Sequence, residues 1–298
     1  LPAAAGIVLG ALTLFLLDEL VRRRGGGEVH SDFLLLSAIT LHNIPEGMAV
    51  GLAFALAADG ESLAGAFALA LGIGVYALWD NQQIYQHADA SLYGDYCPTE
   101  KTKVGFEELR RRNPEIRGWI RIDKTEISYP VVQGKDNYKY INKDAVGKDS
   151  LSGSIFMDYR NASDFSDPNI ILYGHHMAKN TMFGELDEYT DLSFFESHFK
   201  GELYDGNIWH DITFFAFLRA DAYDPVVYDV TTEIIGGTAA YADWLQKKAI
   251  HWKDGMQITN GQFITLSTCT SDGTPNGRYV LIGWMSAPEN VRSGSRIW

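Results

Sequence analysis

Cysteine is scarce in this chain of 298 residues, which contains only Cys97 and Cys269. Two cysteines exclude a disulfide framework and a zinc ribbon, which both need more of them. Basic residues are also in deficit, because 25 Lys and Arg face 38 Asp and Glu, a formal net charge of −13. That excess of acid argues against a surface that tracks nucleic-acid phosphates. No glycine-rich phosphate loop or dinucleotide fingerprint occurs, so no nucleotide is expected.

Charge is missing from long stretches of the first quarter of the chain. Leu1–Leu17 and Leu63–Trp79 contain no charged residue, and Phe33–Ala58 contain only Glu46. Each run is close to the ~20 residues that cross a bilayer as a helix. A cleavable signal peptide would show one apolar core, not three, so the runs predict about three transmembrane helices. Buried helices of a soluble core are the alternative.

A polar motif interrupts the second apolar run. His42 and Glu46 are four residues apart and share a helix face, and Asn43 follows His42. Imidazole, amide and carboxylate ligands together suit a divalent cation such as zinc. The stretch resembles the fourth transmembrane helix of the ZIP metal permeases, and this resemblance implies metal-binding roles for the three residues. The next run, Leu63–Trp79, lacks the polar residues that would complete such a site, so transport by this chain alone is not expected.

The remainder of the chain is rich in short strand-like runs bounded by turn residues. This pattern predicts an antiparallel barrel or sandwich. Helical spacing of apolar residues predicts helices over Phe106–Arg112 and Tyr241–Trp252. The predicted strands are Gly118–Ile122, Ile127–Gln133, Ser154–Tyr159, Ile170–Tyr173, Trp209–Leu218, Gln262–Thr268 and Arg278–Met285.

Three reactive side chains stand at the ends of these predicted strands. Cys269 follows one strand, Arg278 begins the next, and His175 follows a third. A thiolate can act as nucleophile, an imidazole can move protons, and a guanidinium can stabilise an oxyanion. The three types together favour an enzyme that cleaves a peptide bond through a thioacyl intermediate.

Several stretches resemble the class B sortases of Gram-positive bacteria. The resemblance covers about residues 75–285 and implies a closed eight-stranded barrel with added helices. It also implies a cysteine transpeptidase that needs no cofactor. The matching stretches are Tyr76–Asp80, Asn113–Ile120, Tyr129–Gly134, Gly153–Arg160, Leu172–Met177 and Thr265–Cys269.

The resemblance assigns a role to each reactive residue. Cys269 would attack the threonine carbonyl of a sorting motif of the Asn-Pro-x-Thr kind, near the C-terminus of a secreted protein. His175 would be the general acid and base, and Arg278 would hold the oxyanion. A peptidoglycan precursor would supply the accepting amine. Ser267 and Thr268 are expected to line the substrate groove, with a purely structural role in the strand as the alternative.

The chain thus divides into residues 1–74 resembling a truncated ZIP permease, residues 75–102 as anchor end and linker, and a catalytic domain at residues 103–298. The arginines at 22–24 indicate a cytoplasmic segment, whereas Asp80–Glu100, without Lys or Arg, indicates an external one. Two membrane-spanning helices between these segments would return the chain to the same side of the membrane, so both assignments cannot hold. We therefore interpret the chain as a chimera. Its sortase-like part is expected outside the cell membrane. There are two alternatives. One is a zinc permease fragment with an incidental sortase-like barrel, and the other is an anchored surface protein whose barrel is inactive.

Overall fold

The computed structural model describes residues 71–72, 74–76, 79, 82–83, 85–86, 88–99, 103–256, 258 and 261–286. The chain divides into two compact units, Leu1–Gln82 and Gln83–Trp298, and the account below concerns the second. The predicted runs at 1–17 and 33–58, most of the run at 63–79 and the motif with His42, Asn43 and Glu46 lie outside the described residues. Among the residues that are described, no helix has the length and apolar character needed to cross a membrane.

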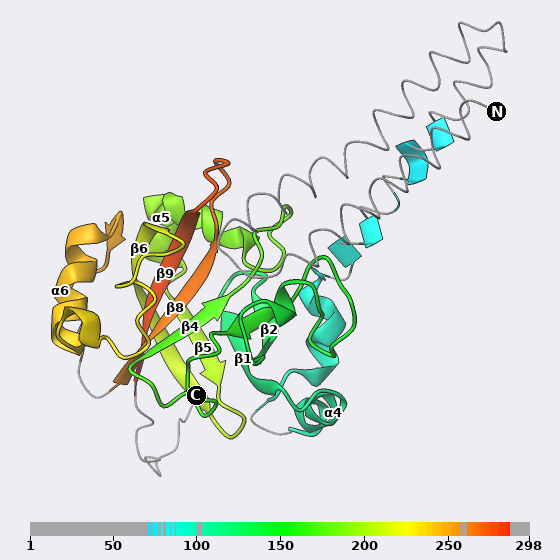
Figure 1. The fold of residues 1–298 in the computed structure, drawn as a ribbon, viewed down its shortest axis with the longest axis horizontal. Helices are drawn as coiled ribbons and strands as arrows, with labels where there is room; N and C mark the ends of the chain where they lie inside the picture. Colours follow the sequence, from blue (N-terminus) through cyan, green and yellow to red (C-terminus); the bar gives the residue numbers. More distant parts are fainter. Residues whose placement is uncertain are drawn as a thin grey trace, which may run out of the picture. The chain divides into compact units, whose positions relative to one another are not determined.

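In the described part of the chain, eight strands close into a barrel (Figure 1). Their order is β5-β1-β2-β3-β4-β8-β9-β6, and pairing of β5 with β6 completes the ring. This confirms the expected closed eight-stranded barrel. The strands are β1 (Ile116–Ile122), β2 (Ser128–Val132), β3 (Ile155–Met157), β4 (Asn169–Tyr173), β5 (Lys200–Tyr204), β6 (Trp209–Asp221), β8 (Gly261–Cys269) and β9 (Gly277–Ser286).

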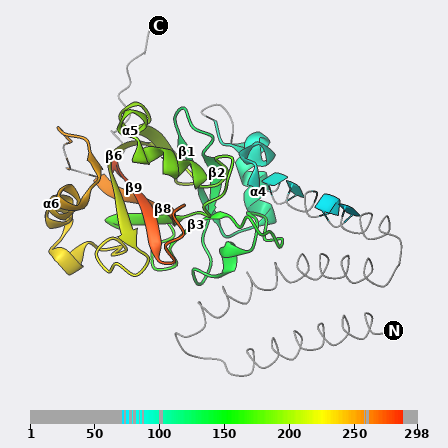
Figure 2. The same ribbon diagram turned by 90° about the horizontal axis from the view of Figure 1, so that it is seen from above.

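The helices cover the outside of the barrel. Helix α6 (Thr238–Lys248) and helix α4 (Val104–Arg112) lie at opposite sides of it in both views (Figures 1 and 2). Tyr241 of α6 packs edge-on against Phe263 of β8, with ring centroids 4.9 Å apart. Strand β8 is buried on both faces from Phe263 to Thr268, and its buried residues include the polar Thr265, Ser267 and Thr268.

The long predicted helix Tyr241–Trp252 is only partly correct. Helix α6 ends at Lys248, and His251–Trp252 form the short strand β7 on the edge of β6. Ile250 N donates to Phe217 O at 2.7 Å and Lys253 N to Phe215 O at 2.7 Å. The apolar residues keep helical spacing up to Trp252, but these backbone hydrogen bonds to β6 make residues 251–252 a strand instead of a helix.

Several elements were not predicted. Strand β5 reads Lys-Gly-Glu-Leu-Tyr and has little strand character of its own, but it lies between β1 and β6, whose hydrogen bonds define it. The expected linker region contains a 3-10 helix, η1 (Ala90–Tyr96). A second 3-10 helix, η3 (Gly184–Thr190), and helix α5 (Leu192–Ser197) follow β4.

Candidate active site

The thiol of Cys269 and the guanidinium of Arg278 belong to directly paired residues. Cys269 ends β8, and its register partner across the hairpin is Arg278 of β9. Directly paired residues in an antiparallel ladder project to one face, with Cβ atoms about 5 Å apart. Cys269 is exposed and free. Arg278 Nη1 donates to Gly277 O at 2.9 Å and, more weakly, to Pro275 O at 3.5 Å, so its side chain stays close to the hairpin.

His175 joins this pair through the parallel ladder of β4 and β8. Tyr173 is the register partner of Ser267, and Gly174 N donates to Ser267 O at 3.2 Å. His175 follows Tyr173 by two residues, as Cys269 follows Ser267, so both stand just beyond the last pair of this ladder. The structure therefore brings the three predicted catalytic residues to one end of the neighbouring strands β4, β8 and β9.

A carbonyl group orients the imidazole of His175. Its Nε2 lies 2.7 Å from Ile141 O, and because a carbonyl only accepts, Nε2 carries the proton there. Nδ1 is then the nitrogen left to exchange a proton with a reactant. Gly153, at φ +60°, passes close to the ring: a Cβ at this position would lie 3.0 Å from His175 Cδ2 and nearer still to the carbonyls of Tyr140 and Ile141. A side chain larger than glycine would displace this support.

A hydrogen-bonded layer underlies the three residues. Tyr228 OH is 2.9 Å from Ser267 Oγ, and Tyr173 OH donates to Asp158 Oδ2 at 2.9 Å. The rings of Tyr173 and Tyr228 are neighbours, with centroids 5.9 Å apart. Burial raises the pKa of Tyr228 to about 12, and the charge of Arg278 opposes that rise. The buried tyrosine is therefore a neutral hydrogen-bonding group beside the cation at neutral pH.

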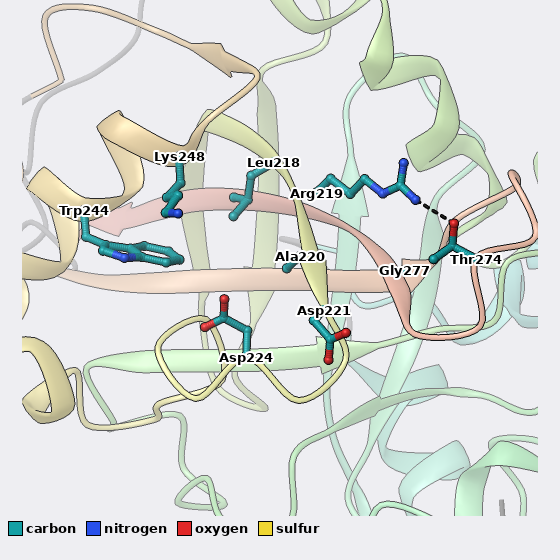
Figure 3. Close-up of a pocket in the computed structure, with 9 residues that line it drawn as sticks. All are labelled: Leu218, Arg219, Ala220, Asp221, Asp224, Trp244, Lys248, Thr274 and Gly277. Atoms are coloured by element: carbon teal, nitrogen blue, oxygen red, sulfur yellow. Dashed lines mark hydrogen bonds between the residues drawn. The ribbon is translucent and has the colours of Figure 1, made fainter. Parts of the chain in front are cut away.

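Two cavities flank this end of the barrel. One, of about 360 Å³, is lined by Asn137, Arg160, Tyr173, Tyr223 and Tyr228 among others, on the β4 side. The other, of about 310 Å³, lies on the β6 side and reaches Gly277, the neighbour of Arg278 (Figure 3). Neither is lined by Cys269 or His175, and the two cavities adjoin each other at Asp224, which lines both.

Comparison with known proteins identifies this arrangement. The profile of the sortase domain matches residues 120–286. The chain belongs to the sortase family. Sortase B of Listeria monocytogenes is 31% identical over 226 residues, covering 72% of this chain and 88% of that protein. Sortase B of Staphylococcus aureus is 34% identical over 170 residues, covering 57% and 69%.

Solved structures agree with the sequence relatives. Clostridium perfringens sortase B superposes with a TM-score of 0.57 and 30% identity, covering 61% of this chain and all of that one. A Staphylococcus aureus sortase B–substrate complex gives a TM-score of 0.58 and 30% identity, covering 70% and 94%. The sortase domain is thus of the sortase B type, and the protein is a cysteine transpeptidase.

A different relative matches a shorter part of the chain. The zinc transporter GufA of Myxococcus xanthus is 39% identical over 83 residues, which cover 25% of this chain and 31% of that protein. The predicted metal ligands His42, Asn43 and Glu46 lie outside the described residues, so their arrangement is not seen. Among the described residues there is no group of three or more His, Cys, Asp or Glu side chains that could hold a metal ion.

The two residues expected to line the groove are buried in the sortase barrel. Ser267 and Thr268 each expose only 2% of their surface. Ser267 bonds to Tyr228, and Thr268 Oγ1 has no hydrogen-bond partner in the part of the chain that is described. Their burial fits the alternative role as strand residues, and direct contact with substrate remains a prediction.

Residues next to the site hold its loops in place. Nε2 of His176, the neighbour of His175, lies 2.8 Å from Asp187 Oδ2, and this contact ties the segment after β4 to η3. Asp158 and Asp167 each accept a backbone hydrogen bond from a nearby residue of the connection between β3 and β4, from Arg160 N and Ala162 N. The hydrogen bonds of Tyr173 and Tyr228 in the hydrogen-bonded layer could not be predicted from sequence, because their partners Asp158 and Ser267 are distant along the chain.

Replacing Asp158 with asparagine is expected to destabilise the sortase barrel in a pH-dependent way. Burial alone raises the pKa of Asp158, but hydrogen bonds from Arg160 and Tyr173 outweigh it and lower the pKa below its ordinary value. A lowered pKa means that the ionised form stabilises the fold above the unfolded-state pKa and that this contribution is lost as pH falls through the folded-state pKa. With Arg160 partly exposed, we expect a loss of about 1–2 kcal/mol at pH 7.

Urea unfolding of the full chain, followed by tryptophan fluorescence, measures this difference at pH 7 and at pH near the ordinary carboxyl pKa. The gap between Asp158→Asn and wild type should shrink at the lower pH. Asp254→Asn, at an exposed turn, is the control and should match wild type at both. A gap of equal size at both pH values would contradict the ionic origin.

Proposed function

We propose that this protein cleaves a sorting motif after threonine, as class B sortases do, and transfers the acyl part to a cell-wall amine. One observation carries the proposal: Cys269 and Arg278 are register partners of β8 and β9, and His175 follows the end of β4, two residues beyond the last β4–β8 pair, Tyr173 and Ser267. Nucleophile, cation and proton carrier thereby converge on one exposed end of the barrel.

In the first half-reaction, the Cys269 thiolate attacks the threonine carbonyl carbon of the motif. The carbonyl oxygen gains negative charge, and Arg278 stabilises it. As the tetrahedral intermediate collapses, the C–N bond breaks and His175 gives a proton from Nδ1 to the leaving amine. The products are a thioacyl enzyme, a neutral His175 and the released C-terminal peptide.

In the second half-reaction, a neutral amine attacks the thioacyl carbon. A C–N bond forms, His175 accepts the proton that the amine loses, and the C–S bond breaks with its electron pair returning to Cys269. This restores the thiolate and the protonated imidazole. No cofactor or redox step is needed, because bonds made and broken balance within the two substrates.

The cavity on the β4 side is the candidate groove for the sorting motif. Its aromatic lining, from Tyr173, Tyr223 and Tyr228, offers stacking surfaces, and Asn137 and Arg160 offer amide and guanidinium donors for peptide carbonyls. A Staphylococcus aureus relative has been solved as a substrate complex, which supports peptide binding to this fold. We propose an Asn-Pro-x-Thr-like motif as the ligand.

The location and the N-terminal region are proposed from the sequence. The uncharged runs at 1–17, 33–58 and 63–79 favour an anchor in the cell membrane of a Gram-positive bacterium, with the barrel outside. The local identity with GufA supports a second candidate role for residues 1–74, as part of a ZIP-type permease with zinc at His42, Asn43 and Glu46. That site is incomplete, so a transport function is the weaker candidate.

The test is capture of the thioacyl enzyme. The full chain is mixed with a panel of Asn-Pro-x-Thr-type peptides, digested, and analysed by mass spectrometry. The expected result is an added acyl mass on the peptide that contains Cys269, removed by hydroxylamine. A folded protein that gives no adduct with any peptide of the panel would refute the proposed motif.

A further inference from the structure

The cavity on the β6 side has no part in the steps described above. It measures about 310 Å³ and lies between β6, at Leu218 to Asp221, and Trp244 and Lys248 of α6 (Figure 3). Asp224, from the segment that follows β6, closes a third side. Its volume is at the lower end of the range that holds small ligands. The question is what such a hollow beside a transpeptidase site could bind.

Strand register relates this cavity to the thiol. Cys269 is the partner of Arg278, and Arg278 is the partner of Ala220, so the three form one row across β8, β9 and β6. Residues of such a row project to the same face, which puts Ala220, in the cavity lining, on the face of the thiol. Neighbouring strands are about 4.8 Å apart, so the row from Cys269 to Ala220 spans roughly 10 Å. Three extended peptide residues span a similar distance.

The two carboxylates of the cavity each have an unused oxygen. Asp221 Oδ1 accepts from Tyr223 N at 2.9 Å, and Asp224 Oδ1 accepts from Val226 N at 2.9 Å. Within the described residues, the Oδ2 atom of neither carboxylate has a hydrogen-bond or ion-pair partner. Both are therefore available to a ligand with N–H groups.

Of the two cations that line the cavity, Arg219 is already ion-paired and Lys248, within the described part of the chain, is not. Arg219 pairs with Asp272 at 2.6 Å and donates to Thr274 Oγ1 at 2.7 Å, so its charge is used in fastening the β8–β9 hairpin. Lys248 has no ion-pair partner among the residues that the structure describes. Together with the indole of Trp244, the cavity offers two carboxylates, one ammonium and an aromatic face. This set suits a short peptide, whose N–H groups and carbonyls need both acceptors and donors, rather than a phosphate.

We propose that this cavity binds the second substrate, as an amine-terminated short peptide. The inference rests on the transpeptidase reaction proposed above. The peptide lies in the cavity with its amine toward Arg278 and Cys269; Asp221 and Asp224 accept its N–H groups, and Lys248 donates to a carbonyl or carboxylate. The donor motif and the acceptor peptide thus approach Cys269 from two adjoining cavities, which share Asp224.

The test separates peptide binding from amine chemistry. The full chain is acylated with the donor peptide, and the thioacyl enzyme is resolved either by triglycine or by hydroxylamine, which is too small to need a cavity. For Asp221→Asn, which lies in this cavity and does not line the β4-side cavity, we expect the triglycine KM to rise about tenfold, since a hydrogen bond to a charged group is lost. Hydroxamate formation should stay within about twofold of wild type, because the first half-reaction does not use this cavity. Lys248→Ala should also raise the triglycine KM.

Matched controls lie on the same helix. Asp243→Asn and Lys247→Ala change the same residue types next to Trp244 and Lys248 without touching the cavity, and should leave both reactions unchanged. Asp221→Asn keeps the Oδ1 acceptor, so the local turn should persist. The acceptor site alone would be overturned by either of two results. One is an unchanged triglycine KM in the cavity variants, and the other is an equal fall in the rates of triglycine transfer and hydroxamate formation. Failure of the wild type to form any hydroxamate would overturn the proposed function and this site with it.

Discussion

Cys269→Ala is expected to abolish thioacyl formation completely. No other described group can replace the thiolate as nucleophile at this end of the barrel, because Cys97 is half-buried in a different apolar cluster, near Phe106 and Trp119. The cysteine side chain is exposed and forms no hydrogen bond that supports the described fold, so its loss should leave the barrel intact. Mass spectrometry after incubation with donor peptide measures the adduct, and circular dichroism checks the fold.

The matched control is Cys97→Ala, which removes the second thiol. Its pKa is raised, mainly by burial, so the reactive thiolate form is disfavoured there. This variant should form the adduct as fast as wild type. Acylation that survives in Cys269→Ala but disappears in Cys97→Ala would reverse the assignment of the nucleophile.

Arg278→Ala is expected to lower kcat/KM for thioacyl formation by about 10²- to 10³-fold, the usual effect of losing an oxyanion donor. The guanidinium is the cation nearest the thiol by strand register, and the backbone pairing of Arg278 with Cys269 does not depend on its side chain. Arg278→Lys should recover only part of the rate, because an ammonium lacks the planar, two-pronged donor geometry. Single-turnover kinetics with a quenched donor peptide give these rates.

Arg111→Ala, on the exposed face of α4, is the control and should retain wild-type kinetics. A fall of less than about threefold for Arg278→Ala would be too small for an oxyanion donor. In that case the cation would have only a structural role in the hairpin, through its hydrogen bonds to Gly277 O and Pro275 O.

The three reactive residues could be predicted from local sequence because each stands at the end of a strongly apolar strand. Runs such as Phe263–Ser267 and Val280–Trp284 are buried on both faces, and their hydrophobicity marks them whatever their partners are. The end of such a run is also where a polar side chain can reach solvent. Hence the strand ends and the residues on them were predicted together.

Elements with weak local signals were missed or misjudged. Strand β5 contains Gly201 and Glu202 and is defined by its neighbours β1 and β6. At His251–Trp252 the chain leaves a helical pattern because its backbone pairs with β6. In both cases long-range hydrogen bonds decide the conformation, and a single segment of sequence does not contain them.

The sequence by itself determined the reaction chemistry of this protein: a thiol, an imidazole and a guanidinium at strand ends, and a family resemblance that the comparisons confirmed for the sortase domain. Only the tertiary structure decided how these groups are arranged. The antiparallel register of β8 with β9 pairs Cys269 with Arg278, and the parallel register of β4 with β8 brings the segment with His175 to the same end of the barrel. The buried layer of Asp158, Tyr173 and Tyr228 and the cavity at Asp221 and Asp224 also depend on it, because the segment after β6 meets its partners only when the barrel has closed.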